Sequence, residues 1–371
     1  MRRRPDRRSA LFITITDNPG GAERVTYGLA SELASRPGWA VEVMIVCSAL
    51  PRSFSREALP PAIRVRYGPS RNPFLAFPWL PLRLLFRRRD LVFTSHIHTN
   101  ALLSMMRRLR LIHIGRLVMR ESMSLFDRFS GPKANIFAFL YRWYGAEDLL
   151  IAQTGYMADH VRPRLSAASA NRLRSLPNPV DMEAIKRGAA EPLDPALRSK
   201  LQSRQNILFC GRFVEFKRPQ IALKAFNRLK EQGAQAQLVF MGAGPLEADV
   251  RQQAASLGIA EDVLFLGQRP NPYPVMAACQ YGLLTSANEG FPNVVLEMMA
   301  CGMRGIVVTP CSGDLDSLTG VTVTRSHEAD EIATALQGML HSPEDMGPTY
   351  RAVAASRSAK RYVDALLGAA G

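Results

Sequence analysis

Short apolar runs alternate with longer segments of helical periodicity through the first half of the chain. The apolar runs predict buried strands, and the periodic segments predict helices between them. The strands are predicted at residues 11–15, 41–46, 91–94, 116–119 and 149–152, and the helices at 22–35 and 134–144. Because strands that alternate with helices form parallel sheets covered by helices, the first half is predicted to be one doubly wound α/β domain.

The same alternation begins again after residues 176–181. Strands are predicted at 206–210, 237–241, 263–266, 282–285 and 305–308, and helices at 220–231, 246–257 and 275–278. Residues 188–204 are rich in alanine, proline and charge, a composition typical of an interdomain connection. The second half is therefore predicted to form a second parallel-sheet domain, with a closing helix at 349–367.

Two domains also agree with the length of the chain, because 371 residues exceed what one core usually holds. The pattern predicts an N-terminal domain at 1–185, a C-terminal domain at 186–348 and a closing segment at 349–371. Packing of that segment back on the first domain is one possible arrangement. In two Rossmann-like domains that face a central cleft, ligands bind at the carboxyl ends of the strands.

The positive charge of the chain lies almost wholly in its first half. Residues 1–185 contain 28 Lys/Arg and 14 Asp/Glu, a net +14, whereas residues 186–371 contain 19 and 18, a net +1. Within 74–89 and 105–111 the arginines are mixed with apolar residues, which favours contact with an anionic membrane. The alternative is a solvated helix face above an ordinary core. Nucleic acid is not expected as a partner, because no aromatic-interleaved basic motif is present.

The chain contains no run of about 20 apolar residues, so no membrane-spanning helix is predicted. The arginine-rich start is followed only by the short apolar run at 11–15 and then by Asp17, so an export signal is not expected. The five cysteines are scattered without a C-x-x-C pair, which favours reduced thiols. We therefore expect a cytoplasmic protein at the inner face of the cell membrane.

Two glutamates, Glu289 and Glu297, bracket the start of a predicted helix. Glu289 is expected in the loop before it and Glu297 about two turns into it. Between them lie the backbone amides of the helix start, which carry a partial positive charge. These amides belong to the segment that contains Gly290, Phe291, Asn293 and Val294. Amides suit an anionic group and carboxylates accept hydrogen bonds from hydroxyls, so a sugar nucleotide fits this arrangement.

A basic loop, residues 211–218, follows a predicted strand of the same domain. Its Arg212 and Lys217 can converge on one diphosphate and stabilise the charge of a leaving group, although a solvated loop is the alternative. Residues 242–245 lack the third glycine of a dinucleotide fingerprint and are interpreted as a tight turn. The loop that contains Gln268 follows the next strand, where its backbone could bind a base edge.

In the first domain, Gly20 and Gly21 precede a helix and could approach a phosphate. His96 and His98 lie at a predicted strand end, where a histidine could hydrogen-bond a sugar or stabilise developing charge. A structural role is the alternative for each histidine.

Two further pairs of polar residues are candidates for the site. Arg120 and Glu121 follow a predicted strand and are expected to point into the cleft. Asp314 and Asp316 form a D-x-D pattern, but their surroundings favour a helix cap over a metal site.

Together these segments resemble glycosyltransferase family 4, whose members have the GT-B fold. The matching motifs are residues 20–24, 177–181, 211–217, 242–245 and 289–297. Their order and spacing cover nearly the whole chain, and the second domain carries the most specific of them. The resemblance implies a retaining transfer from a nucleotide sugar that needs neither a metal nor another cofactor.

The resemblance also implies roles for individual residues. Arg212 and Lys217 would hold the diphosphate, and the amides of Asn293 and Val294 would donate to the phosphate. Glu289 would contact the sugar hydroxyls, and Glu297 would contact the ribose. His96 would lie near the sugar, and Gly21 would belong to the glycine loop. The chain departs from the family at residues 219–220, where glycine or asparagine is usual, and at Arg304, where proline is usual. Residues 309–347 look compressed relative to the family, so the resemblance does not give the details of the acceptor side.

The expected function is transfer of a hexose or N-acetylhexosamine, for example from a UDP-sugar, to a lipid-linked saccharide during bacterial polysaccharide or glycan synthesis. One alternative is a nucleotide-sugar epimerase or hydrolase, which would need no lipid acceptor. A second alternative is a non-catalytic module that binds a membrane or nucleic acid through the basic first half, with binding that weakens steeply as salt rises.

Overall fold

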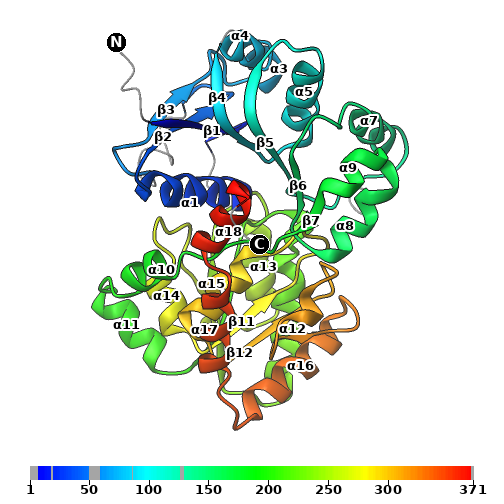
Figure 1. The fold of residues 1–371 in the computed structure, drawn as a ribbon. Coiled ribbons are helices and arrows are strands. Elements are labelled where there is room, and N and C mark those ends of the chain that lie inside the picture. Colours follow the sequence, from blue (N-terminus) through cyan, green and yellow to red (C-terminus); the bar gives the residue numbers. More distant parts are fainter. Residues whose placement is uncertain (1–6, 18–19, 50–58, 86, 126–128, 369–371) are drawn as a thin grey trace. The chain divides into compact units, whose positions relative to one another are not determined.

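The computed structural model describes residues 7–17, 20–49, 59–85, 87–125 and 129–368 and divides the chain into two compact units (Figure 1). The first unit comprises residues 1–179 together with 359–371, and the second comprises residues 180–358. The second unit therefore begins before the predicted position of 186. Arginines 2–4, Asn18 and Pro19 of the glycine loop, and Phe86 of the apolar basic segment lie outside the described residues.

A seven-stranded parallel sheet forms the centre of the first unit, in the order β3-β2-β1-β4-β5-β6-β7. Its strands are β1 (Arg8–Thr14), β2 (Trp39–Ile45), β3 (Arg64–Tyr67), β4 (Arg88–Thr94), β5 (His113–Glu121), β6 (Leu149–Ala152) and β7 (Leu173–Ser175). The five predicted strands are confirmed. Two edge strands were missed, because β3 alternates arginine with apolar residues and β7 has only three residues.

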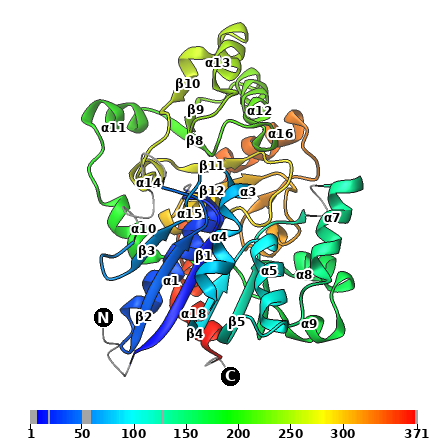
Figure 2. The same ribbon diagram turned by 90° about the horizontal axis from the view of Figure 1, so that it is seen from above.

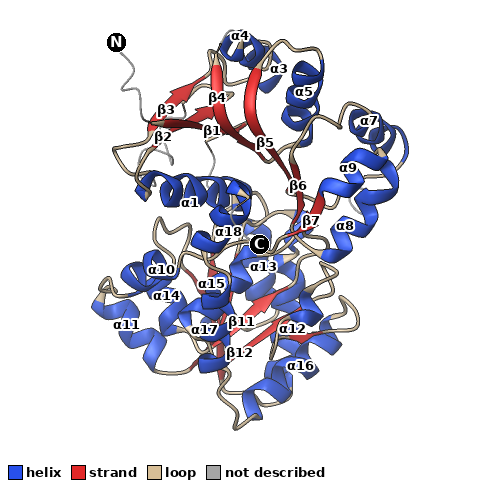
Figure 3. Ribbon diagram, viewed as in Figure 1, coloured by secondary structure: helices blue, strands red, loops and turns tan. Residues whose placement is uncertain are grey.

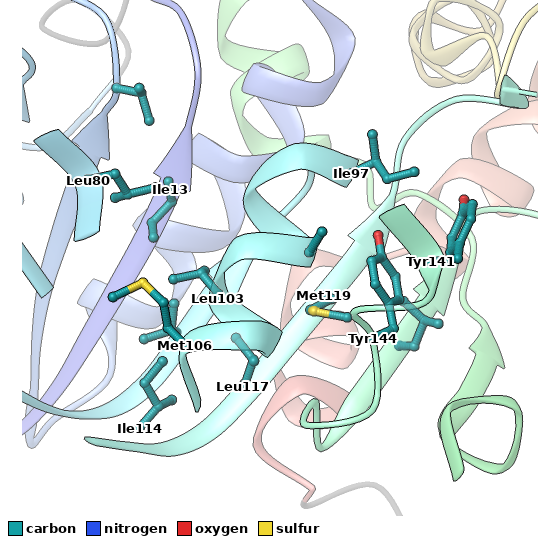
Figure 4. Close-up of a cluster of buried hydrophobic side chains, with 14 of the residues drawn as sticks. Ile13, Leu80, Ile97, Leu103, Met106, Ile114, Leu117, Met119, Tyr141 and Tyr144 are labelled. Atoms are coloured by element: carbon teal, nitrogen blue, oxygen red, sulfur yellow. The ribbon is translucent and has the colours of Figure 1, made fainter. Parts of the chain in front are cut away.

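Helices cover both faces of this sheet. Successive side chains of β1 point to opposite faces and are buried on both, so each face needs a cover. Leu11 and Ile13 point into one core, shown in part in Figure 4, and Ala10 and Phe12 point into the other. The first core is covered by α3 (Pro73–Ala76), α4 (Trp79–Leu84), α5 (Ile97–Arg108), α7 (Gly131–Tyr141) and α8 (Gly155–Val161), with α9 (Ala167–Arg172) after them. The second core is covered by α1 (Gly21–Ser35) and by the final helix, α18 (Ala359–Leu367).

The second unit has a six-stranded parallel sheet in the order β10-β9-β8-β11-β12-β13, with helices on both faces (Figures 2 and 3). Its strands are β8 (Gln205–Cys210), β9 (Ala236–Met241), β10 (Val263–Phe265), β11 (Tyr281–Leu284), β12 (Gly305–Val308) and β13 (Thr322–Val323). Chain order reverses between β8 and β11, and the corresponding reversal in the first unit lies between β1 and β4. The prediction of two doubly wound domains is confirmed.

The helices of the second unit form two groups. One core lies under α12 (Pro219–Glu231), α13 (Glu247–Ser256) and α16 (Ala329–His341). The other lies under α10 (Met182–Ala189), α11 (Pro195–Gln202), α14 (Tyr273–Ala278), α15 (Asn293–Cys301) and α17 (Gly347–Ser356). Both cores are formed by the apolar runs from which the strands were predicted.

Two predictions about connecting segments were wrong. Residues 188–204 are not a simple connection, because they contain α11, which begins with Pro195 and is capped by the Asp194 side chain (Oδ1 to Leu197 N, 3.0 Å). Leu197 and Leu201 of α11 are buried in the core of the second unit. The predicted helix at 349–367 is two helices, because it is interrupted at Arg357 and Ser358, where Val180 pairs with the chain.

Candidate active site

The predicted basic loop of the second unit lies at the carboxyl end of β8, next to the end of β11. These two ends meet where the strand order reverses, the position at which open parallel sheets bind ligands. The Thr285 hydroxyl donates to the carbonyls of Lys217 (3.1 Å) and Arg218 (2.9 Å), and Ala287 N donates to Phe216 O (2.7 Å). The backbone of the loop is therefore fixed to the residues that follow β11.

Lys217 and Glu289 form an ion pair between Nζ and Oε1. Both side chains are 14% exposed, so solvent and ligands can still reach them. The Ser286 hydroxyl donates to the same carboxylate oxygen (2.8 Å), and Glu289 N donates to Cys311 O (2.7 Å). The Glu289 carboxylate is thus held in one place beside a lysine, although the two residues are 72 positions apart in the sequence.

Arg212 and Lys217 share an aromatic neighbour in Phe216. The Arg212 guanidinium carbon lies 5.5 Å from the centre of the Phe216 ring, and Lys217 Nζ lies 5.7 Å from it. Arg212 is exposed and Lys217 is half-buried. The two cations are therefore close to one ring at the end of β8, which suits joint binding of a diphosphate.

The glycines at 242 and 244 allow the loop after β9 to lie directly against the basic loop. A Cβ atom on Gly242, which has φ +147°, would lie 1.9 Å from Gly211 O, and one on Gly244 would lie 2.5 Å from Phe213 O. Hydrogen bonds from Phe213 N to Ala243 O (3.0 Å) and from Leu246 N to Phe213 O (3.1 Å) join the loops. These glycines thus serve backbone packing, in keeping with their interpretation as a tight turn.

The predicted helix start after Glu289 is the N-terminus of α15. Pro292 precedes the helix, Asn293 and Val294 are its first two residues, and the amides of a first turn give a helix N-terminus a partial positive charge. Glu297 is the fifth residue of α15, so it lies about one turn into the helix rather than two. It is half-buried and close enough to Cys301 to contribute, after burial, to raising the pKa of that thiol to about 12.

The remaining predicted donor-site residues also belong to loops at this edge of the sheet. Gly290 O accepts from the Ser312 hydroxyl (3.0 Å), and the Phe291 ring is buried with Arg357 above it at 5.3 Å. Gln268 is exposed in the loop after β10, and Gly267 O accepts from Gly242 N (2.9 Å). Arg212, Lys217, Gln268, Glu289 and the start of α15 therefore share one edge of the second unit.

His96, in the first unit, precedes α5 at the carboxyl end of β4. Its Nε2 lies 3.9 Å from Oε1 of Glu23, a buried residue in the first turn of α1. Burial, followed by the nearby charges of Arg120 and His98, lowers the pKa of His96 to about 4, so the imidazole is neutral at pH 7. A neutral imidazole can both donate and accept a hydrogen bond, as recognition of a hydroxyl requires.

The predicted orientation of Arg120 and Glu121 was wrong, because both side chains are buried inside the first unit. Glu121 accepts from Tyr144 (2.7 Å) and Tyr141 (3.0 Å), and Arg120 Nη2 donates to Asn178 Oδ1 (2.6 Å). Burial raises the pKa of Glu121, while the hydrogen bonds from the tyrosines oppose that shift. The two residues form a structural network below the strand ends.

Gly21 and His98 are exposed, at the start of α1 and in the first turn of α5. The His98 ring contacts Phe137 of α7 edge-on, with 5.9 Å between ring centres. Asp314 precedes a short 3-10 turn, but its side chain does not cap it; instead, its carbonyl accepts from the Ser317 hydroxyl (2.6 Å). Among the described residues, no cluster of three His, Cys, Asp or Glu side chains could hold a metal ion.

Three participants were not predicted from the sequence, namely Glu23, Phe216 and Ser286. Phe216 stands inside the basic loop and Ser286 three residues before Glu289, so their closeness in sequence was an available signal. Glu23 lies 73 positions from His96 and could be associated with it only through the adjacency of β1 and β4. Chemically, the second unit offers two cations, a fixed carboxylate and a helix start for an anionic, hydroxylated ligand.

Comparison with known proteins identifies two matching families. Residues 19–184 match the family described as "Glycosyltransferase Family 4". Residues 204–342 match the family described as "Glycosyl transferases group 1". The putative glycosyltransferase EpsF of Bacillus subtilis is 29% identical over 201 residues, which cover 54% of this chain and 50% of EpsF. This match therefore spans only half the length of that relative.

A second relative, from Campylobacter jejuni, is 28% identical over 288 residues, which cover 75% of each chain. It is described as N-acetylgalactosamine-N,N'-diacetylbacillosaminyl-diphospho-undecaprenol 4-alpha-N-acetylgalactosaminyltransferase. Among solved structures, Anabaena HepE in complex with UDP-glucose gives a TM-score of 0.76 at 18% identity and covers 97% of this chain and 99% of its own. Sucrose-phosphate synthase from Thermosynechococcus elongatus gives 0.75 at 16%, with 98% of each chain covered. At these identities the likeness shows the fold, which is GT-B.

Proposed function

Because the chain belongs to glycosyltransferase family 4, we propose that it transfers a sugar from a nucleoside-diphosphate sugar to a hydroxyl of a lipid-linked saccharide. The observation that carries the proposal is the Lys217–Glu289 pair beside Arg212 and the start of α15. It combines cations for a diphosphate with a carboxylate for sugar hydroxyls at the reversal point of the sheet.

The proposed role of each residue is the one that the family resemblance implies, and it agrees with the chemistry of that residue. Arg212 and Lys217 bind the diphosphate and stabilise the negative charge that develops as it leaves. Glu289 accepts hydrogen bonds from the transferred sugar, and Glu297 accepts from the ribose. The amides of Asn293 and Val294 donate to the phosphate. The bond between the sugar and the phosphate oxygen breaks and its electron pair stays on the diphosphate. The acceptor hydroxyl attacks the same sugar face, and its proton passes to the departing phosphate oxygen. The configuration is thereby retained.

In the first unit, His96 and the glycine loop at Gly21 complete the proposed donor contacts. A neutral His96 donates a hydrogen bond to the sugar without bringing a second positive charge to the site. No metal is assigned to this reaction, since the two cations of the basic loop neutralise the diphosphate. The transferred group is proposed to be a hexose or N-acetylhexosamine, with a UDP-sugar as the first donor to test.

The acceptor is proposed to be lipid-linked for two reasons. The Campylobacter relative is named for a diphospho-undecaprenol substrate. Residues 69–143 of this chain contain 13 Lys/Arg and three Asp/Glu, a net +10, and include large apolar side chains that are exposed. No described helix is long and apolar enough to cross a membrane. We propose that the protein works at the inner face of the cell membrane, in bacterial polysaccharide or glycan synthesis, with the first unit toward the lipid.

The test begins with thermal unfolding in the presence of UDP- and GDP-sugars, because a ligand that binds the folded state stabilises it by mass action. The selected donor is then incubated with and without a polyprenyl-diphosphate-linked saccharide, and products are identified by mass spectrometry. Transfer is expected only with the acceptor; donor conversion without it would indicate an epimerase or hydrolase instead.

A variant pair assigns the activity to the site. Glu289→Ala is expected to abolish transfer while circular dichroism stays unchanged. Glu215→Ala, at an exposed glutamate of the same basic loop, is expected to keep most of it. Full turnover by Glu289→Ala would refute the assigned role.

A further inference from the structure

The helix α7 has apolar side chains around most of its circumference, although Lys133 and Asn135 interrupt them, and it is only partly buried. Of its 11 residues, GPKANIFAFLY, only Tyr141 is buried. A helix that is hydrophobic all round belongs in a protein core or in lipid. Six residues of α7, among them Ile136 and Phe139, are exposed, so part of its apolar surface is not covered by protein.

The inner side of α7 is accounted for by packing within the first unit. Phe137 contacts Phe129 at 5.2 Å and His98 at 5.9 Å between ring centres, and Tyr141 donates to buried Glu121. The helix also lies against α5. Phe137 and Tyr141 are four positions apart, so they form the stripe that fixes the helix to the unit.

The outer side carries a second apolar stripe that nothing in the described chain covers. Ile136, Phe139 and Trp143 are 58%, 53% and 38% exposed, and their spacing of three and four positions places them on one side of the helix and its extension. Phe139 and Trp143 contact each other edge-on, with 6.4 Å between ring centres. Lys133 and Arg142 flank this stripe, and residues 129–146 contain no acidic residue.

The same helical layer contains most of the other exposed apolar side chains. Of the ten large hydrophobic residues that are exposed in the described chain, eight belong to α3, α4, α7 or the segments that directly follow α5 and α7. They are Phe74, Leu75, Leu82, Leu109, Leu111, Ile136, Phe139 and Trp143. Arginines accompany them at 71, 83, 108 and 110. An apolar stripe with cations around it complements a lipid surface with anionic headgroups.

We propose that α7 is the element by which this protein inserts into an anionic membrane, with Ile136, Phe139 and Trp143 among the acyl chains and Lys133 and Arg142 at the headgroups. Tryptophan suits this depth, because its ring is amphipathic. Since Phe137 on the inner stripe touches His98, α7 connects the lipid surface with the strand-end histidines of the first unit. The inference rests on the membrane partner of the proposed function and adds the residues that bind it.

The first experiment reports the position of one side chain and needs no enzymatic activity. The chain has three tryptophans, so the variant Trp39→Phe/Trp79→Phe keeps Trp143 as its single fluorophore. It is mixed with vesicles of phosphatidylcholine containing about 30 mol% phosphatidylglycerol, with or without bromine on the acyl chains. Insertion predicts a blue shift and quenching by the brominated lipid. If the protein binds the vesicles while Trp143 stays unquenched, docking through α7 is refuted.

The second experiment removes the stripe. Ile136→Ser/Phe139→Ser/Trp143→Ser is expected to weaken vesicle binding about tenfold or more, since buried apolar area is lost. It leaves Phe137 and Tyr141 unchanged, and thermal unfolding checks that the first unit is intact. The matched control is Leu257→Ser, at an exposed leucine of the second unit, which should bind like the parent. Equal loss in both variants would overturn the proposal.

Two further readouts separate the remaining explanations. If α7 covers a second copy of the chain, analytical ultracentrifugation will show a dimer that the triple serine variant dissociates, and the membrane proposal falls. Transfer to a water-soluble acceptor analogue, assayed without vesicles, should be the same in the parent and the triple variant. Failure of vesicle binding with normal transfer would refute the membrane partner alone, whereas absent transfer with normal vesicle binding would refute the proposed reaction alone.

Discussion

The Lys217–Glu289 pair leads to a prediction about nucleotide binding in the absence of sugar. In the free protein, Lys217 is engaged by Glu289, and both side chains are half-buried. A nucleoside diphosphate brings negative charge to the same place, so it must attract Lys217 while it repels Glu289. Removal of the Glu289 charge should therefore strengthen binding of the bare diphosphate, although it should abolish sugar transfer.

The expected changes in diphosphate affinity can be calculated from the charges in this site. Two like charges about 5 Å apart repel by about 3 kcal/mol at an effective dielectric constant near 20, and salt with partial exposure reduces this to about 1 kcal/mol. Glu289→Gln is thus expected to tighten binding of UDP or GDP about fivefold. Lys217→Met removes a charge-assisted hydrogen bond and should weaken binding about ten- to a hundredfold.

The assay is isothermal titration calorimetry of UDP and GDP against the parent, both single variants and the double variant. Because the two residues are in contact, the double-mutant cycle should show a coupling of about 1 kcal/mol. The fivefold gain should shrink as NaCl is raised. Glu215→Gln removes an equal charge from an exposed position of the same loop and serves as the control. If Glu289→Gln binds UDP or GDP more weakly than the parent, the proposal that Glu289 repels the diphosphate is refuted.

Two further predictions concern stability. Gly242→Ala places a Cβ about 1.9 Å from Gly211 O at φ +147°. In a urea titration it should therefore lower the free energy of unfolding of the second unit by about 3 kcal/mol or more, and it should also weaken diphosphate binding. The control, Gly258→Ala, has φ +72° but open space around the added Cβ, and it should cost only about 1 kcal/mol in the same titration. The pKa of His96 is about 4 in the folded protein and 6.5 in the unfolded chain. Between these two values the unfolded state binds more protons than the folded state. The free energy of unfolding is therefore expected to decrease as the pH falls from about 6.5 to 4. His96→Gln should therefore reduce the difference in unfolding free energy between pH 7 and 4.5 by about 2 kcal/mol, and an unchanged pH dependence would contradict the buried neutral imidazole.

The parts of the fold that could be predicted from the sequence are those where burial determines composition. Strands β6 and β12 are continuous apolar runs, and the structure has them within the predicted residues. The closeness of the basic loop and Glu289 could also be predicted, because both follow strands that parallel-sheet topology makes neighbours. In contrast, β3 lies at a sheet edge, where arginines are tolerated and the apolar pattern weakens.

The errors concern properties that depend on partners distant in sequence. Glu121 is the last residue of β5, near a strand end as Glu289 is, but three side chains from elsewhere, Asn100, Tyr141 and Tyr144, enclose its carboxylate. The apolar content of 134–144 correctly predicted a helix, yet its exposure could not be predicted, because composition does not say which neighbours are missing. The compressed segment 309–347 contains α16, whose mixed composition lacked a clear boundary signal.

The position of α18 has a consequence for how the protein is made. This helix belongs to the first unit: Arg36 pairs with Asp364 (2.6 Å), Arg116 donates to Leu366 O (2.6 Å), and Leu366 is buried beside the α1 face. The ribosome translates all of residues 180–358 before it reaches α18. The strands of the first unit are thus all synthesised before the second unit begins, but the core that they share with α1 and α18 cannot be completed until the last helix has been made.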